Sequence, residues 1–525
     1  MDRRAFVRST ALAGLGGASL AASGLVLGSA GAAPAFVRGG RPQLTHGVQA
    51  GDVHAGTARL WARADRPSRL VAELSRDPQF RRAVTVKGPA VTDRSDFTGQ
   101  WSVRGLPPGT DVHYRVRAVD LHDPRRSGPA TTGRFRTLPT GRGDVRFLWS
   151  GDIAGQGWGV NPAYGGFRIV DAMARRNADF FVCSGDNVYA DGPVQASVEL
   201  PDGRTWTNLV TEEKSKVAET LQEFRGQYRY NLAADNWRDF LATTAQVVQW
   251  DDHEVTNNWY PGEILDLPQY TEKRVDVLAR RAKQAFHEYL PVAPISPDRD
   301  GRIYRVIHQG PMLDLFVLDM RTHKDPNTAN GETGRDGAGS DGGVLGEKQT
   351  RWLIDELKRS RATWKVIAAD LPIGLVVPDG AAAQEGIAQG DPGAPLGRER
   401  DIARVLTALK QLGIRNHVWL TADVHYTAAH SYSPDRAAYQ EFDPFWEFVS
   451  GPLNAGAFGP NALDGTFGPK AEFVAAPPAP KASPAEGFQF FGEVEIDGHT
   501  QQLTVTLRDV EGTALYTKRL DPRRR

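Results

Sequence analysis

Four short segments of the sequence bring carboxylates together with tyrosine or histidine. They are Ser150–Asp152, Ser184–Asp191, Asp251–Glu254 and Ala422–His425. A phosphate ester gathers negative charge as it is hydrolysed, and two cations about 3.5–4 Å apart can hold its attacking and leaving oxygens. Such a pair needs one carboxylate that bridges both ions, with further oxygen or imidazole ligands for each. These residue types therefore predict a two-metal centre suited to phosphate esters.

The acidic residues of this centre follow predicted strands. Short apolar runs suited to buried strands lie at 145–149, 180–182, 245–250, 313–318, 364–369 and 417–420. Helix-like stretches at 166–177, 271–290 and 347–360 separate several of them, a rhythm typical of α/β proteins. Because ligands in such proteins collect at the carboxyl ends of strands, we expect the acids that follow to converge. These acids are Asp152, Asp186, Asp252, Asp319, Asp370 and Asp423.

The chain divides into three parts by composition. Residues 42–140 contain short alternating runs broken by turn signals, which predicts an antiparallel β-sandwich. Residues 143–525 carry the α/β pattern and end in alternating runs within 488–507, which predict a closing β-hairpin. Two Gly-rich stretches, 327–343 and 379–397, are predicted loops, and 454–484 is low in regular pattern.

The start of the chain resembles an export signal. Arg3 and Arg4 precede a weakly apolar, Gly/Ala-rich run that ends in small residues near Ala32. This pattern predicts a twin-arginine signal peptide over residues 1–35, and so a partner in the twin-arginine translocation machinery. A membrane anchor is the alternative, but the Gly-rich middle makes a poor span. We expect no stable membrane span and a secreted, periplasmic or cell-wall location.

Bulk composition excludes some classes of function. The 63 basic and 63 acidic residues cancel, so nothing predicts a nucleic-acid partner. The single cysteine, Cys183, allows no internal disulfide and is predicted to be a small core residue.

Five motifs in order resemble the alkaline phosphatase D family of the calcineurin-like and purple acid phosphatase metallophosphoesterases. The N-terminal one is His46–Asp52 together with Leu60–Arg63. The two most specific are Ser184–Asp191 and Asp251–Trp259, and Leu318–Arg321 and Gly346–Leu353 add weaker matches. The resemblance implies an α/β/β/α sandwich, preceded by a small fibronectin-III-like β-sandwich. It also implies a phosphoric ester hydrolase, with phosphoester small molecules or phospholipids as substrates.

The resemblance also implies roles for individual residues. Asp186 would bridge the metals, and a water between them would be the nucleophile. Asp152, Tyr189 and His425 would complete a first site, and Asp252, Asp370 and Asp423 a second. His253 would protonate the leaving oxygen or stabilise the developing charge. Asn187, Asn257 and Arg321 would contact substrate, with a structural ion pair as the alternative for Arg321.

The resemblance implies Fe³⁺ at the first site, which a phenolate ligand suits. The carboxylate set of the second site favours Ca²⁺. The best-studied branch of the family has Ser-Cys-Gln where this chain has Ser150-Gly151-Asp152. Asp152 replaces a soft thiolate with a hard oxygen, which leaves manganese, zinc or magnesium open at the first site.

Three classes of function are weighed: a phosphoesterase, a binding protein and a nuclease. The first is a phosphomonoesterase or phosphodiesterase, and its runner-up is a phospholipase D-type phosphodiesterase acting on lipid head groups. A binding protein for a wall polymer, with a degenerate metal core, is a remote alternative from another class. A metal-dependent nuclease would need a basic groove that the composition does not support.

Overall fold

The computed structural model describes residues 40–293, 301–329, 343–391 and 393–523. The predicted signal peptide and most of the predicted loop at 327–343 lie outside these residues. No helix within the described ranges is both long and apolar enough to cross a membrane.

Two large sheets lie face to face at the centre of residues 41–525. The first runs β24 (Ala514–Leu520), β23 (Leu503–Asp509), β22 (Phe490–Ile496), β8 (Val145–Ser150), β9 (Phe180–Ser184), β12 (Ala245–Gln249), β1 (Leu44–Gly51), β2 (Thr57–Ala64), β5 (Thr98–Arg104). The second runs β13 (Arg305–Gln309), β14 (Leu313–Val317), β15 (Trp364–Ala368), β18 (His417–Thr421), β20 (Phe445–Val449), β19 (Thr427–Tyr432), β21 (Pro469–Ala475). Strands β8, β9 and β12 are parallel, as are β14, β15, β18 and β20.

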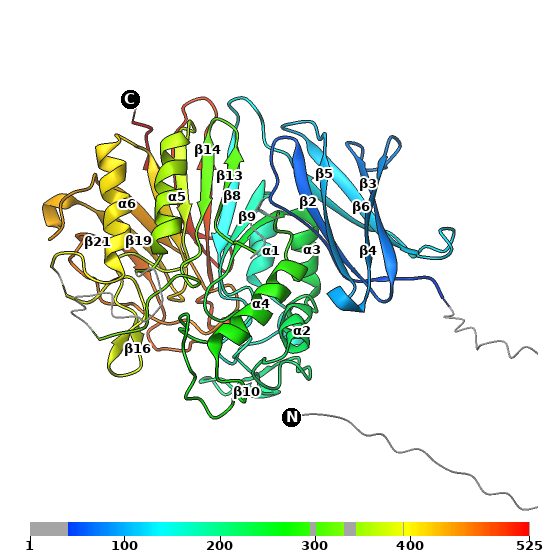
Figure 1. Cartoon of the computed structure of the whole chain (residues 1–525), viewed down its shortest axis with the longest axis horizontal. Helices are drawn as coiled ribbons and strands as arrows, with labels where there is room; N and C mark the ends of the chain where they lie inside the picture. The colour runs from blue at the N-terminus through cyan, green and yellow to red at the C-terminus, as the bar shows by residue number, and fades with distance from the viewer. Residues whose placement is uncertain (1–39, 294–300, 330–342, 392, 524–525) are drawn as a thin grey trace, which may run out of the picture. The chain divides into compact units, whose positions relative to one another are not determined.

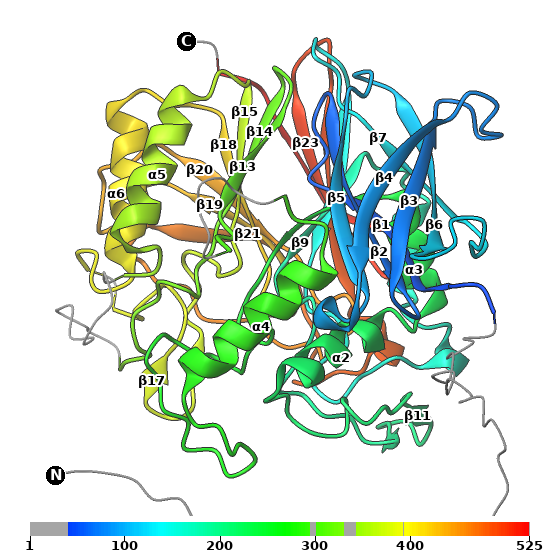
Figure 2. The ribbon, with the colours of Figure 1, turned by 45° about the vertical axis from the view of Figure 1, so that its right-hand side comes forward.

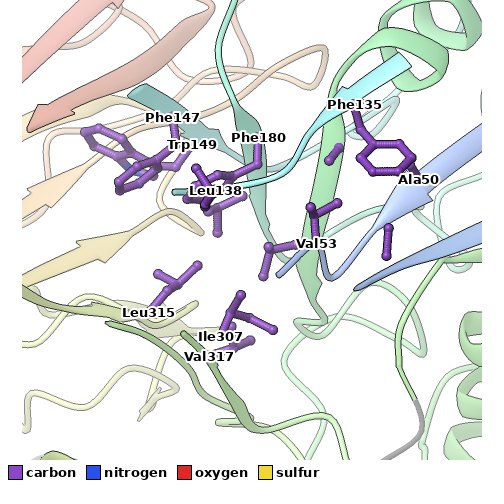
Figure 3. Packing of buried hydrophobic residues seen from close by; sticks show 14 of the residues in the cluster. Ala50, Val53, Phe135, Leu138, Phe147, Trp149, Phe180, Ile307, Leu315 and Val317 are labelled. Carbon is purple, nitrogen blue, oxygen red and sulfur yellow. The ribbon is translucent and has the colours of Figure 1, made fainter. Parts of the chain in front are cut away.

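Strand alternation explains why both faces of each sheet are apolar. In β8, Phe147 and Trp149 join the cluster between the two sheets, whereas Leu148 faces the helices. In β14, Leu315 lies in the same inter-sheet cluster and Phe316 faces helices on the other side. Successive side chains of a strand point to opposite faces, so a continuous apolar run fills two cores at once. Figure 3 shows Phe147, Trp149 and Phe180 in the region shared with Leu315 and Val317.

Helices cover the outer face of each sheet (Figures 1 and 2). The cluster beneath the first sheet is shared with α1 (Ile169–Ala174), α2 (Leu221–Asn231), α3 (Asp235–Thr243) and α4 (Val275–Tyr289). The second sheet packs against α5 (Gly346–Arg359) and α6 (Glu399–Gln411). The result is the expected α/β/β/α sandwich, with Cys183 buried and unpaired in the first helix-facing core.

The N-terminal strands form a smaller pair of layers that continues into the first sheet. A four-stranded sheet runs β4 (Val84–Val91), β3 (Ser68–Ser75), β6 (Asp111–Asp120), β7 (Thr131–Arg136). Strands β1, β2 and β5 pair with one another, and β1 joins β12 in parallel at Gly51 and Gln246. Just after β1, buried Asp52 accepts a hydrogen bond from Nη2 of Arg305 at 2.8 Å. The N-terminal strands are therefore tied to the α/β/β/α part of the chain by sheet pairing and a buried ion pair.

Several predicted elements differ in extent. Helix α1 is only six residues long, shorter than the predicted stretch at 166–177. The predicted C-terminal hairpin is β22 and β23, extended by a third strand, β24. The region at 454–484 contains β21, and 379–397 includes the hairpin strands β16 (Pro378–Asp379) and β17 (Ala383–Gln384). A further small hairpin pairs β10 (Ser197–Glu199) with β11 (Thr205–Thr207). Short strands give too few alternating positions to be recognised by periodicity.

Acid sensitivity is expected at His417, which begins β18 and lies remote from the metal-ligand candidates. Burial, followed by Arg523 and Lys365, lowers the pKa of His417 to about 4. The pKa of histidine in the unfolded chain is about 6.5. Below that pH the unfolded state takes up a proton that the buried ring does not, so the folded state loses stability as the pH falls from about 6.5 toward 4. Between pH 7 and pH 5, we expect the unfolding free energy of wild type to fall by on the order of 2 kcal/mol more than that of His417→Gln. Urea denaturation at both pH values measures this, and parallel losses in the two proteins would contradict it.

Candidate metal centre

The candidate ligands lie in turns that directly follow four parallel strands. Asp152 follows β8, Asp186 follows β9 and Asp252 follows β12, while Asp423 and His425 follow β18. Four of these five residues have a positive φ: 65° at Asp152, 48° at Asp186, 66° at Asp423 and 58° at His425. Non-glycine residues adopt this conformation at an energetic cost and cluster at functional sites. The turns are therefore shaped to aim these side chains rather than to relax the backbone.

The first group of ligand atoms comes from Asp152, Asp186 and His425. All three residues are buried, and one ligand atom of each lies within 4.8 Å of the others. The Tyr189 hydroxyl lies 2.8 Å from Nε2 of His425, and that nitrogen is 3.6 Å from Oδ1 of Asp152. Burial lowers the pKa of His425 to about 4, so its imidazole is neutral and has a lone pair for a cation. The four side chains predicted for the first site thus converge.

Two further groups extend from the first. Asp186, Asp252 and His253 form one, and Asp251, Asp252 and Asp423 form the other. Asp186 belongs to both the first and the second group, which is the position required of a bridging ligand. Asp252 is likewise shared by the second and third groups. The predicted second site therefore assembles around Asp252, with Asp423 on one side and Asp186 on the other.

Asp370 is fully buried and belongs to none of the three groups, and its Oδ2 has no hydrogen-bond partner among the described residues. Its Oδ1 accepts a hydrogen bond from Nε2 of Gln249 at 3.4 Å, and its Oδ2 lies 3.7 Å from Nε of Arg321. Asp251, which the sequence favours as a supporting residue, has a carboxylate oxygen within 4.8 Å of ligand atoms of Asp252 and Asp423. Asp319, the sixth strand-end acid, accepts hydrogen bonds from Trp250 and Thr322. It is thus engaged in local structure and lies outside the three groups.

The buried carboxylates of the three groups are suited to binding cations. Both carboxylate oxygens of Asp152 are buried without a hydrogen-bond partner among the described residues, as is Oδ2 of Asp251. Burial and the neighbouring carboxylates raise the pKa of Asp186, Asp152 and Asp423 well above the usual range. Burying so many like charges without compensation is expensive. Hard cations bound among these oxygens would remove that cost.

His253 is held against the ligand cluster by Asp191, for which the sequence predicted no role. Nδ1 of His253 lies 2.8 Å from Oδ1 of Asp191, and its ring centroid is 4.1 Å from that of Tyr189. Nε2 lies 3.9 Å from Oδ2 of Asp252. Burial lowers the pKa of His253, but Asp191 and Asp252 outweigh it and raise the pKa to about 9. Asp191 also accepts a hydrogen bond from the backbone N–H of Asn257, so it fixes both the ring and the adjacent turn.

The three predicted substrate contacts occupy different positions. Asn187 is buried, and its amide donates to the Gln249 carbonyl and to Glu254, both at 2.8 Å. Asn257 is exposed and lines the cleft above the ligands. Arg321 has no exposed surface; its Nη1 donates to Glu385 at 2.5 Å and its Nη2 to Asp423 at 3.2 Å. Its Nε also donates to Asp251. Of the two alternatives for Arg321, the buried ion pair describes this geometry.

A cleft of about 330 Å³ opens over the ligand groups. Asp186, Asp252, Asp423 and His425 line its floor. Its walls come from distant segments, including Asn257, Asn258, Asp379, Phe458 and Asn461. Glu385 and Asp379 lie in the predicted loop at 379–397, where no pattern distinguishes them from solvent-exposed acids. Only the folded position of β16 and β17 brings them to the cleft.

Close packing around Asp152 makes Gly451 sensitive to substitution. A Cβ added at Gly451 would collide with Oδ2 of Asp152. We expect Gly451→Ala to displace that carboxylate and to lower kcat by about 100-fold, since a shift of about 1 Å in a reacting group has effects of this size. Metal content and turnover of p-nitrophenyl phosphate measure the effect. Gly141→Ala, where a Cβ meets no atom within 4 Å, is the matched control; equal activity of the two variants would contradict the prediction.

The fold and the ligand groups define a metal-dependent phosphoesterase. The fold is similar to that of purple acid phosphatase PPD1 from yellow lupin (Lupinus luteus) seeds, with a TM-score of 0.53 and 11% identity. That likeness covers 91% of this chain and 74% of the lupin chain. A structure of PhoD is also similar, with a TM-score of 0.68, 22% identity, and coverage of 93% and 90%.

The chain belongs to the PhoD-like phosphatase family, whose family model matches residues 147–507. The model for the N-terminal domain of PhoD-like phosphatases matches residues 30–139. Alkaline phosphatase D of Bacillus subtilis (strain 168) is 27% identical over 453 residues, which are 83% of this chain and 73% of that relative. The chain is therefore an enzyme, a metal-dependent phosphatase, as the motifs predict.

Proposed function

We propose that this protein hydrolyses phosphomonoesters, phosphodiesters or both, as an exported enzyme of the alkaline phosphatase D type. The observation that carries the proposal is the overlap of the ligand groups at Asp186, at the floor of a cleft. One carboxylate shared by two cation positions is the arrangement of two-metal sites, which stabilise both the attacking and the leaving oxygen of an in-line displacement at phosphorus. Export rests on the twin-arginine sequence at residues 1–35.

Two metal positions follow from the donor types. Asp152, Asp186, Tyr189 and His425 would hold Fe³⁺ or another transition metal, because phenol and imidazole join hard oxygens there. Asp186, Asp252, Asp370 and Asp423 would hold Ca²⁺, because their donors are all carboxylate oxygens. When bound, the two cations supply charge neutralisation for the ester and an activated water.

The chain's own residues then orient and protonate the ester. Asp191 holds Nδ1 of His253, which leaves Nε2 turned toward Asp252 and the cleft floor. We assign His253 the transfer of a proton to the leaving oxygen. Asn257, exposed at the cleft, is placed to donate to a phosphate oxygen. Asn187 and Arg321 act by holding Glu254 and the acidic cluster in position.

Activity and metal content test the proposal together. Purified mature protein is assayed on p-nitrophenyl phosphate, its bis-ester and phosphatidylcholine, and its metals are measured by elemental analysis. We expect turnover of the first two, one transition metal and calcium, and a drop of about 100-fold or more in His253→Ala. His122→Ala, at an exposed histidine, is the control.

The outcomes separate the rival functions. Phosphatidylcholine turnover far above the other two would favour a phospholipase D-type phosphodiesterase. Full activity in both Asp186→Ala and His253→Ala would show that the catalytic residues lie elsewhere. A metal-free protein inactive on every ester would favour the remaining alternative, a wall-polymer binding protein. We further propose that residues 42–140 shape one side of the enzyme, while the chemistry resides in 143–525.

A further inference from the structure

A second cavity lies between helix α4 and the N-terminal strands, apart from the metal cleft. Its volume is about 760 Å³, against about 330 Å³ for the cleft. Arg59 of β2 and Gln100 of β5 form one side, and Arg280 and Lys283 of α4 form another. Figure 2 shows α4 running beside the end of β5. Among the described residues, none lines both this cavity and the metal cleft.

The cavity wall carries an excess of positive charge. Among the described residues, Arg59, Arg280, Lys283 and Arg302 line it, and Asp276 is the acidic residue. Within the described ranges, none of the four basic groups has a carboxylate within 4.0 Å, and Arg59 donates only to Gln100 and Ser102. Asp276 is already engaged by the backbone N–H of Gly262. Lys283 lies over the ring of Trp250, 5.5 Å from its centroid, and Arg302 lies over the ring of Tyr304, 4.5 Å from its centroid. Aromatic rings leave the positive charge in place, so cations in a concave wall attract an anion from solution.

Two buried donors in the same wall lack acceptors. Nε1 of Trp259 and Nε of Arg302 have no hydrogen-bond partner among the described residues. Trp259 is only 2% exposed, so water from bulk solvent does not readily reach its indole N–H. A buried donor without an acceptor costs about 1–3 kcal/mol. Neither nitrogen has surface that a water molecule can reach, so these donors do not contact a ligand in the cavity and the basic side chains carry the attraction for an anion.

We propose that this cavity is a second ligand site, which binds an organic anion through a phosphate group. Phosphate offers only acceptors, and arginine presents donors in a fork that matches its geometry. The cavity is larger than a phosphate ion needs, and Ala279, Val292 and Trp250 give it an apolar part. A phosphate joined to an apolar or ring-bearing group therefore fits both the charge and the size.

Binding of phenylphosphonate to the metal-loaded enzyme tests the site, since its carbon–phosphorus bond is not an ester. Isothermal titration should find two binding events in wild type. We expect Arg280→Gln/Lys283→Gln to weaken one of them at least tenfold and to keep the other. Asp186→Asn should lose the binding event at the metal centre and keep the event at the second cavity. If the metal-centre proposal is wrong, only the result for Asp186→Asn changes.

Matched controls make the result decisive. Arg82→Gln/Lys87→Gln removes the same charge from two exposed positions, one in the turn before β4 and one in β4, and should retain both events. Circular dichroism shows whether each variant is folded. A single event in wild type that survives in Arg280→Gln/Lys283→Gln would overturn the proposal. Equal binding of uncharged benzyl alcohol at the second site would also overturn it, because the site would then be apolar rather than anion-selective.

Discussion

Replacing Asp186 with asparagine is expected to abolish most activity and to empty both metal positions. Asparagine keeps the shape of the side chain but removes the charge that both ligand groups share. Loss of one such stabilising group lowers kcat on the order of 1,000-fold, and here two cations depend on it. Elemental analysis and turnover of p-nitrophenyl phosphate measure the two effects on the same preparation.

Neighbouring substitutions distinguish bridging from ordinary ligation. Asp152→Asn should weaken only the first metal and Asp423→Asn only the second, because each belongs to a single side of the cluster. Asp239→Asn, on the exposed face of α3, should change neither. If Asp186→Asn kept both metals and activity within threefold of wild type, Asp186 would not be the bridge.

The same variant should have an opposite effect on stability once metal is removed. In the metal-free protein, burial and the nearby carboxylates raise the pKa of Asp186, which reflects unfavourable burial of its charge. Asp186→Asn removes that charge and is expected to raise the thermal midpoint of chelator-treated protein. In metal-loaded protein it should lower the midpoint, because binding energy for the native state is lost.

The second large effect is expected at Arg321, on stability rather than on substrate affinity. Its guanidinium has no exposed surface and lies among Asp251, Glu385 and Asp423. Burial opposes its charge, but these carboxylates outweigh burial and raise the pKa of Arg321. Arg321→Met would leave buried acids without their counter-charge, a loss of about 3–5 kcal/mol when one partner of a buried pair is removed.

Urea denaturation of metal-loaded Arg321→Met and wild type measures that loss. Arg321→Lys should fall between them, because lysine keeps the charge but its single nitrogen lacks the planar fork through which three separate nitrogens of Arg321 face three carboxylates. Arg82→Met, at an exposed arginine, is the control and should be neutral. An unchanged unfolding free energy with a raised KM would instead restore Arg321 as a substrate contact.

Local pattern was sufficient for the strands and for the acids that follow them. The runs at 145–149, 180–182, 313–318 and 417–420 correspond to β8, β9, β14 and β18. Each run alternates between two apolar cores, so the signal lies in residues two apart and needs no knowledge of the fold. The acid or histidine placed just after a strand is equally local. For this reason Asp152, Asp186, Asp252 and His425 were recognisable from sequence.

Only the tertiary structure decided which further acids join the cluster and which support it. Asp251 has an oxygen close to Asp252 and Asp423, Asp370 accepts a hydrogen bond from Gln249, and Asp319 accepts one from Trp250, although all three follow strands. The direction of each side chain depends on turn conformations and on the register between distant strands, which the residues themselves do not encode locally. Asp191 at His253 and Glu385 at Arg321 meet their partners across 62 and 64 residues of chain. The sequence by itself determined the strands and the ligand types, and long-range packing determined how the charges are shared.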